Sequence, residues 1–211
     1  MEPKRHDADK PDAFDRPWLK TLGDVLEFVS KAHASRTRQP GVPDINHLIE
    51  CFNILVQADI VDNSTLCAAL LHDVLEDTDT TYEDLSQRFG KEIADIVLEC
   101  TDKKGLSPIE KKQAQMEDIT KLSNPAKLVK LADKLSNCSG LITSPPPFWS
   151  ENEIMFYMAW CRKLVEQVKG LNHILDMRLF KTFLDGNIAR FSNDMLNHAV
   201  ELYYLNIKNS D

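Results

Sequence analysis

The chain has 211 residues, 43% of them hydrophobic and 27% charged, a composition typical of a soluble globular protein with one substantial core. The formal net charge of −8 argues against a protein that coats nucleic acid, although a local basic site for one small anion is compatible with it. The polar amino end lacks the apolar stretch of a signal peptide, and no apolar run approaches the roughly 20 residues of a membrane span.

The five cysteines are scattered, odd in number and without a CxxC pair, which favours reduced thiols and a cytoplasmic location. Because of the net negative charge and the lack of a long apolar run, we expect neither a nucleic acid nor a membrane as a partner.

Helical periodicity dominates the chain, and no convincing alternation of apolar and polar residues marks a strand, so the sequence predicts an all-α fold in a single domain. A loose arm is expected over 1–17. Residues 35–44 should form a loop, because two prolines and a glycine interrupt any helix there. The predicted helices cover about 18–34, 45–58, 63–76, 81–90, 91–101, 109–119, 125–139, 150–184 and 187–207.

Several helix boundaries carry recognisable capping residues. Asn63 or Ser64 is expected to cap the helix over 63–76, and Thr81 with Asp84 resembles a capping box. The last segment, 185–211, is expected to be a helical extension packed on a domain over 18–184, and it is a candidate dimer contact.

The chemistry-bearing motif is the run Ala-Ala-Leu-Leu-His-Asp-Val-Leu-Glu-Asp at 68–77. On a continuous helix, Asp73 and Asp77 fall on the inward leucine face, and His72 and Glu76 lie on its flank. Four ionisable groups beside an apolar segment are costly to bury without a partner. A divalent cation with carboxylates beside it is suited to hydrolysis. A solvated helix end is the alternative interpretation.

The helix over 125–139 has a leucine-rich core stripe and, on its opposite side, Lys130, Asp133 and Asn137. That polar side is either an ordinary solvated face or the lining of a cleft. His47, early in the helix over 45–58, is likewise a cap or surface residue or a third component of the same site.

Together, His47, His72-Asp73 and Asp133 resemble the H…HD…D pattern of the HD metal-dependent phosphohydrolases. Further segments are similar to the hydrolase domain of the RelA/SpoT proteins, and without a synthetase domain the chain most resembles the small alarmone hydrolases, including the metazoan SpoT homologue. The resemblance covers about 20–184 and implies an HD-domain helical bundle. Its other matching segments are Glu76-Asp77-Thr-x-Thr, Phe89-Gly90, Thr101-Asp102 and Lys127-Leu-Val-Lys-Leu-Ala-Asp133-Lys-Leu-x-Asn137.

The resemblance implies one Mn²⁺ per site and removal of the 3′-pyrophosphate of (p)ppGpp, an alarmone of the stringent response, giving GDP or GTP plus pyrophosphate. Glu76 and Asp77 would orient or deprotonate the attacking water. The implied ligand set contains no cysteine, which argues against a structural zinc site. The metal ligands that it implies are His47, His72, Asp73 and Asp133.

Substrate phosphates require cations in addition to the metal. Arg38 matches the loop arginine of the family, Asn137 a nucleotide contact and Tyr157 a residue near the phosphates. Arg38 is the first candidate, and the weaker candidates are Lys130, Lys134, Lys111 and Lys112. Each lysine has surface solubility as its alternative role, and Tyr157 has core packing.

The chain departs from the family in the loop before His47, where Asp44 replaces an aromatic residue and Leu48 replaces a proline. Two alternatives stay open, and the altered loop supports the first of them. One is a phosphatase for another nucleotide, such as NADPH or an adenosine alarmone. The other is a non-catalytic HD scaffold that binds a nucleotide or a protein.

Overall fold

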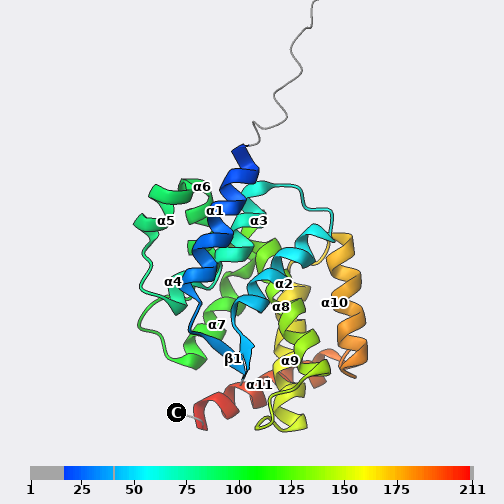
Figure 1. Ribbon diagram of the computed structural model, residues 1–211. Coiled ribbons are helices and arrows are strands. Elements are labelled where there is room, and N and C mark those ends of the chain that lie inside the picture. Colours follow the sequence, from blue (N-terminus) through cyan, green and yellow to red (C-terminus); the bar gives the residue numbers. More distant parts are fainter. Residues whose placement is uncertain (1–16, 40, 210–211) are drawn as a thin grey trace, which may run out of the picture.

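α-Helices make up most of the chain in the computed structural model, which describes residues 17–39 and 41–209, and this confirms the all-α, single-domain prediction (Figure 1). No helix in these two ranges combines the length and apolar character that crossing a bilayer requires. The helices are α1 (Pro17–Ala32), α2 (Ile45–Val56), α3 (Asn63–Leu71), α4 (Val74–Asp77), α5 (Tyr82–Phe89), α6 (Lys91–Cys100), α7 (Pro108–Asp118), the 3₁₀ turn η1 (Ile119–Lys121), α8 (Asn124–Thr143), α9 (Glu151–Glu166), α10 (His173–Asp185) and α11 (Asn193–Asn209).

The core is built around α3 and α8, which pack against each other and against α2 and α6. α3 also contacts α1, so Leu70 and Leu71 on adjacent faces are both fully buried. α8 buries Leu131 and Leu135 on its apolar side. Since α8 is enclosed by its neighbours, part of its polar side is also removed from solvent, which positions charged groups inside the bundle.

The helix predicted over 63–76 is interrupted at His72 and Asp73. α3 ends at Leu71, and α4 begins at Val74 with Asp73 as its N-cap at φ −96°, ψ −6°. The predicted N-cap was also wrong, because Asp62 accepts the bond from the Thr65 amide at 2.8 Å. The interruption means that Asp73 and Asp77 do not continue the inward face of α3.

Other predicted boundaries were also wrong. The segment 35–44 contains an antiparallel hairpin of β1 (Thr37–Gln39) and β2 (Val42–Pro43), in which Gly41 adopts φ +81°. The single helix predicted over 150–184 is divided into α9 and α10, because Gly170 adopts φ +96° and Asn172 caps α10.

Other local predictions were confirmed. Thr81 and Asp84 form a capping box, and Gly90 follows α5. The helix predicted over 187–207 begins later than expected: Asn187 adopts φ +62°, and α11 starts at Asn193, packs along α9 and contacts α7. The predicted arm over 1–17 lies, apart from Pro17, outside the described residues.

Candidate active site

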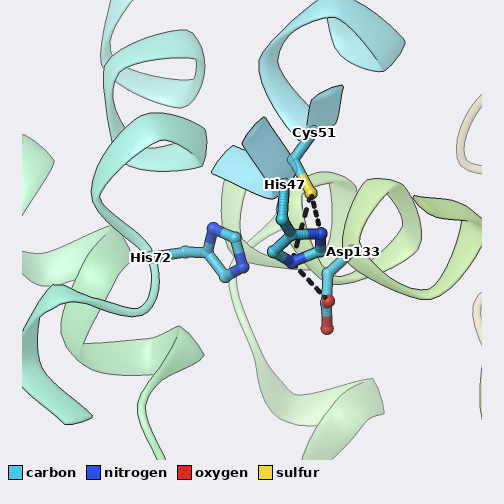
Figure 2. A group of neighbouring side chains, drawn as sticks. All are labelled: His47, Cys51, His72 and Asp133. Atoms are coloured by element: carbon cyan, nitrogen blue, oxygen red, sulfur yellow. Dashed lines mark hydrogen bonds and ion pairs between the residues drawn. The ribbon is translucent and has the colours of Figure 1, made fainter. Parts of the chain in front are cut away.

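Two histidines and two aspartates meet where α2, the α3–α4 junction and α8 converge. His47 Nε2 lies 3.2 Å from Asp133 Oδ1 and 3.9 Å from Asp73 Oδ2. His72 Nε2 lies 3.2 Å from Asp73 Oδ1. Figure 2 shows the imidazoles of His47 and His72 side by side, with Asp133 reaching His47 from α8. The ring centroids of the two imidazoles are 5.2 Å apart. The structure thus brings together all four residues that the sequence proposed as ligands.

Hydrogen bonds on the far side of each imidazole fix its tautomer. His72 Nδ1 lies 2.9 Å from the carbonyl of Ala69, and a carbonyl can only accept, so Nδ1 carries the proton. His47 Nδ1 donates to Ser136 Oγ at 2.9 Å, because that hydroxyl already donates to Glu50 at 2.8 Å. Both Nε2 atoms therefore present lone pairs toward the carboxylates, the orientation that metal-binding histidines adopt.

This donor set fits a divalent cation. Lone pairs facing carboxylate oxygens repel one another unless a proton or a metal ion lies between them. His47, His72 and Asp133 are only 5%, 3% and 7% exposed, and buried His72 Nε2 forms no hydrogen bond. Two imidazole nitrogens and two carboxylates would leave room in an octahedral shell for water and a substrate oxygen.

Asp133 remains ionised despite its burial. Burial alone raises the pKa of this carboxyl, but the charge of Lys134, the largest opposing effect, helps to hold the pKa well below its ordinary range. Lys134 Nζ lies 2.7 Å from Asp133 Oδ2, and the Asn137 amide donates to Asp133 Oδ1 at 2.6 Å. Asp133 is therefore a charged, oriented carboxylate.

Cys51 is a neighbour of this cluster that sequence reasoning missed. Its sulfur lies 3.7 Å from His47 Nε2, one helical turn along α2 (Figure 2). Burial, followed by the charges of Asp133 and Asp73, raises the pKa of the thiol well above its ordinary value. Cys51 is thus a neutral thiol, and only its i,i+4 spacing from His47 could have revealed it.

A cavity of about 640 Å³ opens in front of the cluster. Its size lies within the range of small-molecule sites. All five residues predicted to bind substrate line it, and so do Lys112 and Trp149. Those five are Arg38, Lys130, Lys134, Asn137 and Tyr157.

The cavity wall is polar and cationic on one side. Arg38 from the hairpin donates to the Asn137 side-chain oxygen, which connects the loop to α8. Burial and repulsion from Lys134 lower the pKa of Lys112 to about 8, so this lysine is largely charged at neutral pH. Lys111, the fourth lysine proposed from the sequence, is not among the lining residues. The polar side of α8 therefore lines a cleft, as one of the two sequence interpretations proposed.

Glu76 and Asp77 point in different directions. Glu76 lines the cavity and accepts a hydrogen bond from the Asp102 amide at 2.7 Å. Asp102 in turn accepts from the Gln115 side chain at 2.8 Å. Burial raises the pKa of Glu76, so this carboxyl exchanges protons closer to neutral pH than an ordinary glutamate.

Asp77 is instead held by Arg36, whose guanidinium lies 2.8 Å from the Asp77 carboxylate and also donates to its backbone carbonyl at 2.8 Å. Asp77 is not among the residues that line the cavity. Burial and nearby Asp73 raise its pKa, whereas Arg36 opposes the increase. Its predicted place beside the attacking water would require a change in this arrangement.

Asp44, which stands where the family has an aromatic residue, is also directed away from the cavity. It is buried, its carboxylate lies 3.0 Å from His33 Nδ1, and it does not line the cavity wall. The hydrogen bond from His33 lowers the pKa of Asp44. The extra negative charge is therefore neutralised locally instead of facing a bound phosphate.

A second cavity of similar volume lies beyond Asp102, Gln115 and Lys130, which line both cavities. Its lining is mainly apolar, and none of His47, Asp73 or Asp133 takes part in it. The chemistry-bearing residues thus gather in the cavity in front of the histidine cluster.

Comparison with known proteins agrees with this geometry. The HD domain family matches residues 25–147. The guanosine-3′,5′-bis(diphosphate) 3′-pyrophosphohydrolase MESH1 of Xenopus tropicalis is 40% identical over 169 residues, which cover 79% of this chain and 94% of the relative. The human MESH1 protein is 39% identical over 165 residues, covering 77% of this chain and 92% of the relative.

A solved structure described as a metazoan ortholog of SpoT that hydrolyzes ppGpp superposes with a TM-score of 0.77 at 36% identity. The superposition covers 86% of this chain and 99% of that one. Sequence and fold agree over nearly the full length of these relatives, and the chain therefore belongs to the HD-domain family, together with the MESH1 pyrophosphohydrolases.

Proposed function

We propose that this protein is a Mn²⁺-dependent pyrophosphohydrolase that removes the 3′-pyrophosphate of ppGpp or pppGpp. The observation that carries the proposal is the convergence of two tautomer-fixed histidines and two aspartates at the end of a lysine-lined cavity. The relatives named as guanosine-3′,5′-bis(diphosphate) 3′-pyrophosphohydrolases and the solved SpoT ortholog support this substrate class.

In this mechanism His47, His72, Asp73 and Asp133 hold the metal. When bound, Mn²⁺ would lower the pKa of a water and polarise the phosphoryl group. Glu76 accepts the proton of the attacking water, because it lines the cavity and its raised pKa suits proton exchange.

The attacking water forms a new P–O bond, and the bond between the phosphorus and the ribose 3′-oxygen breaks. The 3′-oxygen takes up one proton as it leaves, which balances the proton that Glu76 removes from the water, and the products are GDP or GTP and pyrophosphate. Lys130, Lys134 and Arg38 neutralise the phosphates, and Tyr157 with Trp149 forms the wall of the cavity. Asp77 supports the site through its contact with Arg36.

The test uses purified protein that is first treated with EDTA and then given Mn²⁺ and ppGpp, with released GDP and pyrophosphate quantified. We expect both products in equal amounts, only with metal, and their loss in Asp73→Asn, which keeps the side-chain shape. Metal-loaded protein that releases neither product would contradict the proposal.

The same assay separates the alternatives. Turnover of NADPH or of an adenosine alarmone in place of ppGpp would identify a phosphatase for another nucleotide. Nucleotide binding without turnover, unchanged by Glu76→Gln, would identify a scaffold.

A further inference from the structure

The C-terminal helix α11 reaches the wall of the active-site cavity through Tyr203. α11 packs along α9, and Tyr203 is 9% exposed on the face that meets α9. Its ring centroid lies 5.8 Å from that of Tyr157 and 5.7 Å from that of Trp160. A residue near the carboxyl end of the chain thus contacts a residue that lines the cavity.

These rings belong to an aromatic cluster of Trp149, Tyr157, Trp160 and Tyr203. Trp149 and Tyr157 meet edge to face with centroids 5.8 Å apart, and Tyr157 and Trp160 are 6.0 Å apart. Trp149 and Tyr157 line the cavity, whereas Trp160 is fully buried behind them. The cluster therefore forms a continuous aromatic support between α11 and the cavity.

Two cavity lysines lie against the same support. Lys112 Nζ lies 5.2 Å and Lys134 Nζ 5.4 Å from the centroid of Trp160. An ammonium group within about 6 Å of an indole face is attracted to it, most strongly where water is excluded. Lys134 is only 4% exposed and pairs with Asp133, so Trp160 helps to fix a cation beside the metal-ligand cluster.

We propose that Tyr203 is a positioning residue for substrate binding, which holds Tyr157 and Trp160 so that Lys112 and Lys134 face the phosphates of the bound nucleotide. The inference rests on the proposed pyrophosphohydrolase function. It makes α11 a component of the active site, beyond its packing on the domain. The ring contacts of Tyr203 are with Tyr157, Trp160 and Tyr204, and none of these is a metal-ligand candidate, so loss of Tyr203 should weaken substrate binding more than metal binding.

The test compares three variants of the full-length, Mn²⁺-loaded protein. Tyr203→Ala should raise the KM for ppGpp about tenfold, the order expected from weakened cation–aromatic contacts, with kcat and Mn²⁺ content little changed. Tyr203→Phe keeps the ring and should retain the wild-type KM. Leu196→Ala removes a buried side chain of the same helix that packs near Ala159, so it controls for general loosening of α11.

A second measurement separates this inference from the proposed function. The dissociation constant of inorganic pyrophosphate, measured by calorimetry on the Mn²⁺-loaded protein, requires no turnover. Wild-type protein that binds pyrophosphate but does not hydrolyse ppGpp would defeat the proposed function, while the affinities of the variants would still decide the role of Tyr203.

An equal loss of affinity in Tyr203→Ala and Leu196→Ala would overturn the inference, and so would unchanged pyrophosphate affinity in Tyr203→Ala. Should Tyr203→Ala fail to fold, Tyr203→Leu replaces it, because leucine fills much of the space without the ring. Weakened binding in Tyr203→Leu, with wild-type binding in Tyr203→Phe, supports the inference.

Discussion

Replacing Ser136 by alanine tests whether the hydrogen bond behind His47 prepares this imidazole to bind a metal. Ser136 Oγ accepts a hydrogen bond from His47 Nδ1 at 2.9 Å and donates one to Glu50 at 2.8 Å. The variant removes the acceptor without adding bulk. His47 can then move its proton to Nε2, which lies 3.2 Å from Asp133, and in that tautomer it cannot bind a cation there.

The size of the effect follows from the burial of both groups. His47 is 5% and Ser136 3% exposed, so in Ser136→Ala water has little access to the His47 Nδ1–H, which has lost its acceptor. A buried donor without a partner costs about 1–3 kcal/mol, which corresponds to a roughly 5- to 150-fold loss of metal affinity. Loss of such outer hydrogen bonds at metal sites typically weakens affinity by about 10–100-fold.

The assay is titration of metal-free protein with Mn²⁺, followed by calorimetry or by the electron paramagnetic resonance signal of free Mn²⁺. Ser64→Ala is a matched control, because Ser64 also donates to a glutamate at 2.8 Å, but at an exposed site at the amino end of α3, away from His72. We expect weaker Mn²⁺ binding in Ser136→Ala only. Wild-type Mn²⁺ affinity in Ser136→Ala would refute the reasoning that the far-side hydrogen bond sets the His47 tautomer.

The remaining predictions concern the carboxylates and the metal. Glu76→Gln should lower kcat by about 10²–10⁴-fold with Mn²⁺ binding retained. In the wild type Glu76 must be ionised to act as the base, so activity should fall as the pH decreases through the raised pKa of Glu76. A fall in activity at the ordinary glutamate pKa would contradict this role. Arg36→Ala removes the ion pair that holds Asp77 and should reduce kcat about tenfold. Lys31→Ala breaks the exposed pair with Glu27 and should leave kcat unchanged. Equal kcat values in the two variants would contradict a role for the Arg36–Asp77 contact. Removing Mn²⁺ with EDTA should lower the melting temperature by about 5–10 °C relative to protein at 100 times the Kd, since such binding contributes about 2.7 kcal/mol; coincident melting curves would mean that no metal binds the folded state.

Local sequence signals predicted much of the fold. Helical periodicity identified the helical segments, and the capping box at Thr81 and Asp84 with Gly90 correctly bounded α5. These features depend on residues within a turn or two of each other, so they can be read without knowledge of the partners. The hairpin over 37–43 was missed because strands of three and two residues are too short to show alternation.

The ligand candidates could be proposed from the sequence because their types and order match a family pattern, and the structure brings His47, His72, Asp73 and Asp133 within a few ångströms of one another. At the site, periodicity failed where it was extended across His72. It treated the motif as one helix, whereas the chain ends α3 there and starts α4, which directs Glu76 into the cavity and leaves Asp77 with Arg36.

By itself, the sequence determined the helical class and most helix boundaries, because residue type and local spacing are sufficient for both, and its resemblance to a family pattern supplied the metal-ligand candidates. Only the tertiary structure decided that Ser136 orients His47 across 89 residues of chain, that Cys51 is a neutral neighbour, and that Tyr203 supports the cavity wall. These relations depend on how α2, α8, α9 and α11 pack, and contacts between helices distant in the chain leave no period in the sequence.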